Sequence, residues 1–332
     1  MGRIITFGEI LLCLSAPGAA RLKQSKILEI DFGGAEANVA VSLAQFEEEV
    51  SFVSRLPEND MSAQAKMSLK SFGVDVKPIL KGGNRMGLYY YENGAVYRSG
   101  KVIYDRDFSS MATIAPGMVD WDKVFEGADW FHWTGISPAL SESAYYTTLE
   151  ALKEAKFRGI TISGDYNYRS NLWNWGKGHT EVMPELLQYC DIMSGIHPDV
   201  DIVKEGLSDA LFEQAGEEML GQYPNCKMVV FTSRGSVSAS HNLWSGALYD
   251  GGKVYRSKQY NLTHIVDRVG TGDAFMAGLI YGLRNLKDKQ EAVEFATASS
   301  ALKHFIPGDQ NICTIEEVHK LVYEDQRGLI SR

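Results

Sequence analysis

The chain has 332 residues, of which 45% are hydrophobic and 23% charged, and its net charge is −9 at pH 7. This composition is typical of a globular enzyme with one large α/β domain and a smaller appendage, or of two domains. No Lys/Arg block occurs, which argues against a nucleic-acid partner because binding to phosphates needs a concentrated basic surface. The longest apolar stretches are only about strand length, so we expect no membrane contact and a cytoplasmic protein.

Strand-like and helix-like segments alternate along the chain, a pattern that predicts a parallel sheet covered by helices. The predicted core strands are residues 4–9, 50–54, 130–134, 160–165, 191–194 and 228–232. The predicted helices between them are residues 36–46, 61–72, 143–156, 181–189 and 211–220. The four cysteines, scattered and without a CxxC pair, indicate neither a disulfide framework nor a zinc site.

One region breaks this alternation. Residues 87–104 form two aromatic and β-branched runs joined through Glu92-Asn93-Gly94, which predicts a hairpin with a type I′ turn at Asn-Gly. Asp250-Gly251-Gly252 predicts a second hairpin, and residues 11–32 look extended.

The extended segments predict a small β-sheet lid. We assign residues 11–32 and 84–112 to this lid, and residues 1–10, 33–83 and 113–332 to the α/β body. A lid of this kind can close over a substrate and exclude water, as phosphoryl transfer requires.

Two glycines precede the first predicted helix. Gly33 and Gly34 would allow a ligand to approach the backbone closely, and Asn38 lies one helical turn further on with an amide suited to a hydroxyl-rich ligand. The alternative is that the glycines merely end a strand and Asn38 serves as a cap. The segment alone does not decide between these interpretations.

A second glycine segment, Gly270-Thr271-Gly272-Asp273, precedes an apolar helical run. Free amides at a helix start, together with the helix dipole, form an anion hole for a phosphoryl group. A carboxylate there would repel phosphate, but Asp273 could take the proton from an attacking hydroxyl. The alternative is an aspartate that only caps the helix.

Two other nucleotide-binding classes are not supported. The first strand is followed by Glu9-Ile10-Leu11-Leu12, not by the GxGxxG turn of dinucleotide-binding folds. The GxxxxGK[ST] motif of P-loop proteins is absent from the sequence.

At this point a family resemblance appears. GGAEANVA from Gly33 and DRVGTGDAFMAGL from Asp267 resemble, in this order, the two signatures of the ribokinase-like (PfkB) carbohydrate kinases. The resemblance implies a three-layer α/β/α fold with a central, mostly parallel sheet and a small β-sheet lid. It also implies ATP and Mg²⁺ as cofactors and leaves a monovalent cation open. Asp273 would be the base, and the amides of residues 270–273 the anion hole.

A narrower resemblance concerns the substrate. Residues 165–173, DYNYRSNLW, look like the DxNxRxxLW segment of 2-dehydro-3-deoxygluconate kinases. The match implies that Arg169 and Arg106, with Tyr89 and Tyr104, recognise a sugar acid, for which a guanidinium suits the carboxylate. Without it, Arg106 would be a solvated lid charge and the tyrosines ordinary strand residues.

The nucleotide contacts are expected at VVFTSRG, with Thr232, Arg234 and Gly235 beside the nucleotide and Asn167 near the transferred phosphate. Residues 298–308 would flank the adenine. The resemblance has departures: where the family has an Asn-x-x-Glu motif associated with magnesium, this chain has Ile196-His197-Pro198-Asp199. The metal ligands therefore stay unknown.

These patterns predict ATP-dependent phosphorylation of the primary hydroxyl of a sugar acid, with 2-dehydro-3-deoxy-D-gluconate as the first choice. The alternatives are a neutral-sugar kinase of the same fold and a non-catalytic sugar-acid sensor. The exposed edges of the lid favour a homo-oligomer, a dimer or a larger assembly.

Overall fold

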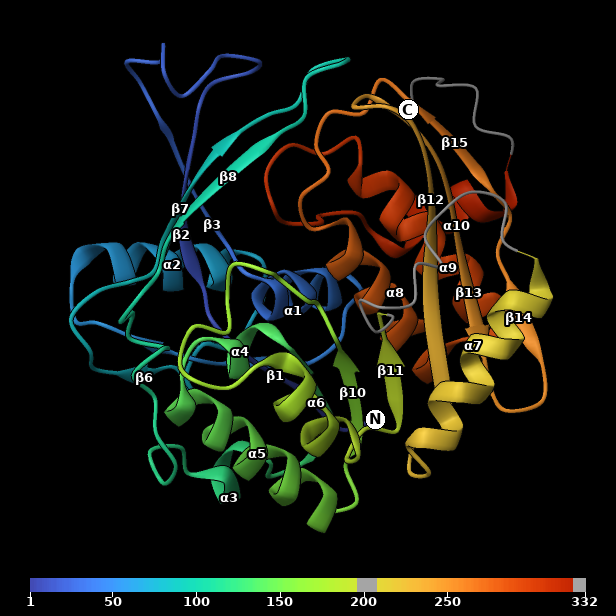
Figure 1. Ribbon diagram of the computed structural model, residues 1–332, viewed down its shortest axis with the longest axis horizontal. Helices are drawn as coiled ribbons and strands as arrows, with labels where there is room; N and C mark the ends of the chain where they lie inside the picture. Colours follow the sequence, from blue (N-terminus) through green and yellow to red (C-terminus); the bar gives the residue numbers. More distant parts are fainter. Residues whose placement is uncertain (196–207, 325–332) are drawn as a thin grey trace.

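The computed structural model describes residues 1–195 and 208–324, and places a large sheet between two layers of helices (Figure 1). Within these residues the sheet has nine strands in the order β14-β13-β12-β11-β10-β9-β1-β4, with β15 paired to β13. Six neighbouring strands, β4, β1, β9, β10, β11 and β12, run parallel. Strand β13 pairs antiparallel with β12, and β14 and β15 both pair antiparallel with β13. The predicted three-layer fold with a mostly parallel sheet is confirmed.

The strands of this sheet are β1 (Arg3–Phe7), β4 (Val50–Val53), β9 (Ala128–Thr134), β10 (Thr161–Asp165), β11 (Ile192–Ser194), β12 (Met228–Ser238), β13 (His241–Tyr249), β14 (Val254–Arg256) and β15 (Tyr260–Thr263). All six predicted core strands occur close to their expected bounds, and β12 extends beyond its predicted end. The parallel strands are apolar because helices cover them on both faces.

One face of the sheet is covered by α1 (Ala35–Gln45), α2 (Asp60–Ser71), α8 (Thr271–Asn285), α9 (Lys289–Lys303) and α10 (Ile315–Tyr323). The other face is covered by α3 (Trp121–Val124), α4 (Ile136–Ala139), α5 (Glu142–Phe157), α6 (His179–Leu187) and α7 (Asp209–Gln222). The five predicted helices are α1, α2, α5, α6 and α7. Each helical layer packs its own hydrophobic cluster against the sheet, so the core is divided in two by the sheet.

A separate four-stranded sheet, in the order β3-β2-β7-β8, projects from the body at the upper left of Figure 1. It consists of β2 (Leu11–Ser15), β3 (Glu29–Gly33), β7 (Leu88–Glu92) and β8 (Lys101–Asp105). Both segments assigned to the lid supply strands to it. A short two-stranded parallel sheet is formed by β5 (Arg55–Leu56) and β6 (Leu80–Lys81), which precede and follow α2 in the chain.

The position of the turn predicted for the first hairpin is wrong. Strands β7 and β8 pair antiparallel, but the turn lies at Val96-Tyr97, where Ala95 and Arg98 exchange two hydrogen bonds of 2.8 Å. Val96 takes the left-handed conformation, with φ 48°. The Arg98 guanidinium also binds the carbonyl oxygens of Ala19 and Asn93, which holds the loop in this longer form. The second predicted hairpin is confirmed, since β13 and β14 pair across Asp250.

The close approach of α8 and α9 generates a prediction about two glycines in helices. A Cβ on Gly278 in α8 would lie 2.8 Å from Ala296 Cα in α9, whereas one on Gly221 in α7 would meet no described atom within 4 Å. We expect Gly278→Ala to lower the melting temperature because two helix backbones must separate. Gly221→Ala, the matched control, should be neutral or stabilise by up to about 1 kcal/mol. Thermal unfolding of both variants checks this, and equal shifts would contradict the packing argument.

Candidate active site

A cavity of about 500 Å³ lies where the small sheet meets the body. This volume falls in the range of about 300–1,000 Å³ that small-molecule sites occupy. The cavity is lined by the start of α8, the start of α1, the segment after β10, and residues of β7, β8 and β12. All the predicted site residues line it except Gly33 and Gly235. The structure therefore brings together residues that are far apart in the sequence.

The two exceptions have structural reasons. A Cβ on Gly33 would lie 2.0 Å from an Asp309 carboxylate oxygen, and one on Gly34 would lie 2.0 Å from the Glu9 carbonyl oxygen. At Gly33 the close approach is therefore made by the Asp309 carboxylate, whereas Gly34 both approaches Glu9 and lines the cavity. Gly235 lies in β12 opposite Leu243, whose Cβ would be 3.2 Å from an added Cβ.

Helix α8 begins at the turn for which the sequence predicts an anion hole, called here the anion-binding turn (residues 270–273). Gly270 is its N-cap and has a left-handed backbone, with φ 74° and ψ 2°. The Ala274 amide donates to the Gly270 carbonyl at 2.9 Å, so the amides of residues 271–273 precede the first helical hydrogen bond. The Thr271 carbonyl in turn accepts a hydrogen bond of 2.7 Å from Ser300 of α9. These free amides are the donors that a phosphoryl group requires.

Asp273, the proposed base, lies in the first turn of α8. Its Oδ2 accepts a hydrogen bond of 2.7 Å from Asn38 Nδ2. Burial raises the pKa of Asp273 to about 7, and the charges of Asp165 and Asp309 act in the same direction, while the Asn38 bond and Arg169 oppose them. A carboxylate with this pKa can accept a proton near neutral pH. The Asn38 amide, predicted to face a ligand, is instead bound to this carboxylate.

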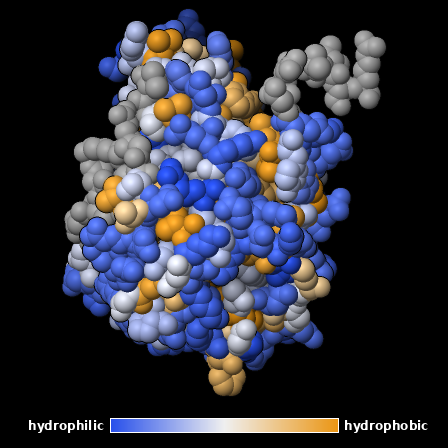
Figure 2. All heavy atoms as spheres, turned by 90° about the vertical axis from the view of Figure 1, so that its right-hand side faces the viewer, coloured by the Kyte–Doolittle hydropathy of each residue, from blue (hydrophilic) through white to orange (hydrophobic). Residues whose placement is uncertain are grey.

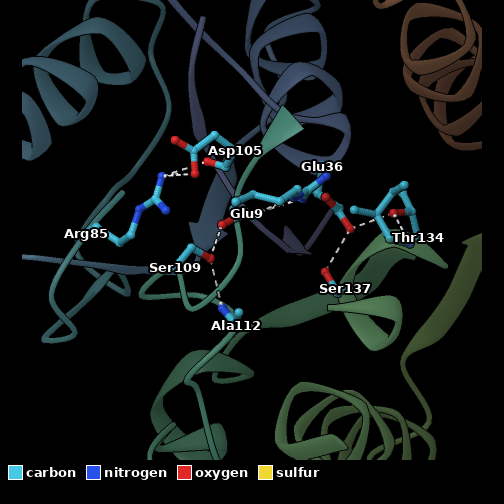
Figure 3. A network of polar contacts seen from close by, with 10 residues as sticks. Glu9, Glu36, Arg85, Asp105, Ser109, Ala112, Thr134 and Ser137 are labelled. Atoms are coloured by element: carbon cyan, nitrogen blue, oxygen red, sulfur yellow. Dashed lines mark hydrogen bonds and ion pairs between the residues drawn. The ribbon is translucent and has the colours of Figure 1, made fainter. Parts of the chain in front are cut away.

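Arg106, predicted to bind the substrate carboxylate, is paired within the protein. Its Nε and Nη2 donate to Glu9 Oε2 at 2.9 and 2.5 Å, and both side chains are buried. Ser109 donates to the other Glu9 oxygen and accepts a bond from the Ala112 amide (Figure 3). Glu9 is not among the predicted site residues, because a lone acid after a strand carries no local motif.

Glu36 forms a second buried carboxylate centre beside Glu9 (Figure 3). It is fully buried in the first turn of α1, and its Oε1 accepts hydrogen bonds from Thr134 at 2.7 Å and Ser137 at 3.1 Å. Burial raises its pKa to about 7. The sequence analysis also missed Glu36, although an acid among the small residues of GGAEANVA was an available signal.

Two tyrosines connect the small sheet to the body. Tyr89 donates to Asp309 at 2.5 Å and Tyr91 donates to Asp267 at 3.0 Å. Both rings come from β7, while Asp267 lies three residues before Gly270 in the chain and the Asp309 carbonyl approaches Gly270 in space. Burial raises the pKa of Asp309 to about 6, against the effect of the Tyr89 bond. Tyr89, predicted to contact the substrate, thus also has a partner in the protein.

Arg169 lies on the exposed side of the cavity. Its Nη1 donates to the Tyr168 carbonyl at 2.9 Å. Burial raises the pKa of both Asp165 and Asp273, and the Arg169 charge opposes this rise, so Arg169 lies within electrostatic reach of Asp273. Asn167, next to it, has a left-handed backbone with φ 40°, and its amide donates to Asp165 at 3.1 Å. Among the predicted carboxylate readers, Arg169 is the one with its guanidinium open to solvent.

Two arginines meet on the nucleotide side of the cavity. Arg234 lies over the Trp244 ring, 5.3 Å from its centroid, and Arg268 donates to Asn242 at 2.8 Å. Burial lowers the pKa of Arg234 to about 10, and the charge of Arg268 adds to this effect. Within the described part of the chain neither guanidinium forms an ion pair with a carboxylate. Two neighbouring cations without a counter-ion suit a polyphosphate, so Arg268 joins the candidate site.

Free helix-start amides beside a carboxylate of pKa near 7 are what a kinase acting on a hydroxyl group requires. Comparison with known families gives the same class. Residues 1–316 match the model of the pfkB family carbohydrate kinases, and the chain belongs to this family and is a carbohydrate kinase. The predicted family is therefore confirmed.

Individual relatives are similar over nearly the whole chain. The crystal structure of 2-dehydro-3-deoxygluconokinase from Thermotoga maritima is 41% identical, with a TM-score of 0.91 over 97% of this chain and 99% of that one. The 2-dehydro-3-deoxygalactonokinase of Haloferax volcanii is 31% identical over 326 residues, 98% of each chain. The 2-dehydro-3-deoxygluconokinase of Bacillus subtilis is 27% identical over 316 residues, covering 92% of this chain and 91% of the relative.

Neither a protein metal cluster nor a membrane-spanning helix is found in the described part of the chain. In residues 1–195 and 208–324, no group of three or more His, Cys, Asp or Glu side chains could hold a metal ion. Ile196 to Asp199, where a magnesium motif was sought, lie outside the described residues. The same part of the chain contains no helix with the length and hydropathy to cross a membrane.

The contact between Asn38 and Asp273 predicts a change in pH dependence. A hydrogen bond to the ionised carboxylate lowers the pKa, so Asn38→Ala should raise the pKa of Asp273 above about 7. The base acts in its ionised form, so kcat/KM falls when the pH drops below this pKa. The acidic limb of the kcat/KM profile should therefore move to higher pH in Asn38→Ala, by about one pH unit or more.

The pH profile of kcat/KM measures this shift. Ser42→Ala is the matched control, because Ser42 lies one turn further along α1 and bonds the Asn38 carbonyl, not Asp273. An acidic limb that stays in place in Asn38→Ala would contradict the assignment of the limb to Asp273.

Proposed function

We propose that this kinase phosphorylates the primary hydroxyl of a sugar acid with ATP, and that 2-dehydro-3-deoxy-D-gluconate is the substrate. The observation that carries the proposal is that one cavity holds the base Asp273 and the solvent-open guanidinium of Arg169. A base is needed at the hydroxyl end of the substrate and a cation at the carboxylate end. The names of the relatives support a dehydro-deoxy sugar acid.

In the proposed reaction, different residues of the cavity serve as base, as hydrogen-bond donors to the phosphoryl group and as phosphate contacts. Asp273 takes the proton from the substrate hydroxyl as the hydroxyl oxygen attacks the γ-phosphorus of ATP. The bond between this phosphorus and the β–γ bridging oxygen breaks, and ADP leaves. The amides of residues 271–273 donate to the phosphoryl oxygens as charge develops on them. Arg234 and Arg268 hold the phosphates that stay behind, and Asn167 lies near the transferred group. Asp273 is then neutral until it returns its proton to water.

Magnesium is expected to enter with the nucleotide. Mg²⁺ keeps several waters and binds through substrate phosphates and one or two protein carboxylates, so a protein cage of three acids is not required. Asp165, beside Asn167 on the cavity wall, is the described carboxylate that fits this role. The ion would neutralise negative charge on the β- and γ-phosphates.

The lid boundaries and the oligomer remain predictions. The small sheet exposes apolar side chains, including Ile30 of β3 at 54% and Ile103 of β8 at 42%. By contrast, the face that carries β14 and α7 is mainly hydrophilic, with scattered hydrophobic residues (Figure 2). Association of two copies through the small sheet would cover this apolar surface.

Asp273→Asn tests the base. We expect kcat to fall by about 10²–10⁴-fold, because the amide cannot accept the proton, while the sugar acid still binds. Calorimetric titration measures binding and a coupled ADP assay measures turnover. The folded state raises the pKa of Asp273 from 3.8 to about 7, so ionisation costs stability above this window. The variant should therefore melt no lower than the wild type at pH 8, and near-normal turnover would refute the assignment.

A substrate panel with Arg169→Ala and Arg106→Ala tests the substrate class. The wild type should phosphorylate 2-dehydro-3-deoxygluconate better than its galactonate epimer, gluconate, fructose or ribose. Arg169→Ala should raise KM for the acid by about 10–100-fold, the value of a lost charge-assisted hydrogen bond, and leave the melting temperature unchanged because Arg169 is exposed.

Arg106→Ala provides the contrast. It should lower stability by about 3–5 kcal/mol, since Glu9 would remain buried without its partner. Preference for fructose would favour the neutral-sugar kinase, and binding without turnover would favour the sensor. An unchanged KM for the acid in Arg169→Ala would remove the basis for its role.

A further inference from the structure

A buried lysine lies directly behind the anion-binding turn. Lys303 is the last residue of α9 and is fully buried. Its Nζ donates to the carbonyl oxygens of Ile306 at 3.0 Å and Gly308 at 2.7 Å. An isolated ammonium group is costly to bury, so its surroundings must replace the water it has lost.

These surroundings resemble the binding site of a dissolved cation. Among the described residues, no carboxylate comes within ion-pair distance of Lys303. Three acids, Asp31, Asp267 and Asp309, are nevertheless close enough for charge–charge interaction with it. The ammonium is therefore held by carbonyl oxygens inside the field of several acids. Carbonyl oxygens that replace a hydration shell are the ligands that proteins offer to K⁺.

The position of Lys303 connects it to the phosphoryl site. Its Cε would lie 3.5 Å from a Cβ built on Gly270, and the Asp309 carbonyl oxygen would lie 1.9 Å from the same atom. The residues that bind the ammonium, Ile306 and Gly308, immediately precede Asp309. The ammonium thus holds residues 306–309 in place. These residues contact Gly270, the N-cap after which the free amides of α8 begin.

We propose that Lys303 is a built-in monovalent cation that positions the anion-binding turn, so that phosphoryl transfer by this chain needs no dissolved potassium. Lys303 does not touch the substrate and acts as a positioning residue. The proposal rests on the proposed role of the turn at residues 270–273, but not on the identity of the sugar. The simpler alternative is a lysine that only satisfies carbonyl groups after the end of a helix.

The experiment compares cations in the wild type and three variants. Lys303→Ala leaves a space of ammonium size, Lys303→Met fills the space without charge, and Lys320→Ala removes a half-buried lysine from α10 as the control. For each protein, kcat and the melting temperature are measured in the chlorides of tetramethylammonium, Na⁺, K⁺ and NH₄⁺.

We expect the wild type and Lys320→Ala to have the same kcat in every salt. Lys303→Ala should lose about 10–100-fold in tetramethylammonium, the usual effect of a misplaced catalytic group, and recover several-fold in K⁺ or NH₄⁺ but less in Na⁺. Lys303→Met should lose as much and recover in none. A gain in melting temperature with K⁺ or NH₄⁺ for Lys303→Ala alone would support the same conclusion without turnover.

Three outcomes would overturn the proposal. A wild type that requires K⁺ already has a site for a dissolved ion. A Lys303→Ala protein that keeps its turnover does not depend on the ammonium. One that is equally impaired or unfolded in every salt shows a structural role only. A wild type without activity on any sugar acid would refute the proposed substrate, whereas the ion dependence of the melting temperature would still be measured.

Discussion

The contact between Gly270 and the Asp309 carbonyl is the constraint on which the site depends. No side chain fits at residue 270, since a Cβ there would lie 1.9 Å from that oxygen, and the left-handed backbone also favours glycine. This contact fixes where α8 begins. The helix start fixes the free amides, and the third helical residue, Asp273, is thereby placed beside Asn38. Displacing residues 306–309 would move the anion hole and the base together.

The buried acids of the cavity create an electrostatic problem for binding a negatively charged nucleotide. Burial raises the pKa of Asp273, Glu36 and Asp309, and ionised acids close together would repel a polyphosphate. Arg106 is neutralised by Glu9, and Arg169 opposes the rise in the pKa of Asp273. Arg234 and Arg268 lie together on one wall, and the acids accept hydrogen bonds from neutral tyrosine, serine, threonine and asparagine side chains. The proposed base thus lies among carboxylates with neutral partners, and the proposed phosphate contacts are two arginines without a carboxylate partner among the described residues.

The sequence predicted the fold and the start of α8 well, because both are encoded by local patterns: alternating apolar segments, and glycines before a helix. It failed where distant segments decide. Asn93-Gly94 favours a tight turn, but the Arg98 contacts with Ala19 and Asn93 select a longer loop. Glu9 and Asp309 carry no motif, and their role appears only once β1, the small sheet and the C-terminal turn lie together. For the same reason, no local signal showed that Arg106 would be paired with Glu9.

The small sheet and the phosphoryl site are linked by the periodicity of one strand. Residues two apart in a strand point to the same face, so Tyr89 and Tyr91 of β7 face the body together and donate to Asp309 and Asp267. The carboxylate of Asp309 thus holds the lid, while its carbonyl supports Gly270. Movement of β7 must break or shift both tyrosine bonds at once. A substrate that closes the small sheet over the cavity therefore acts on the same residue that supports the anion-binding turn, which ties the exclusion of water to the placement of the phosphoryl group.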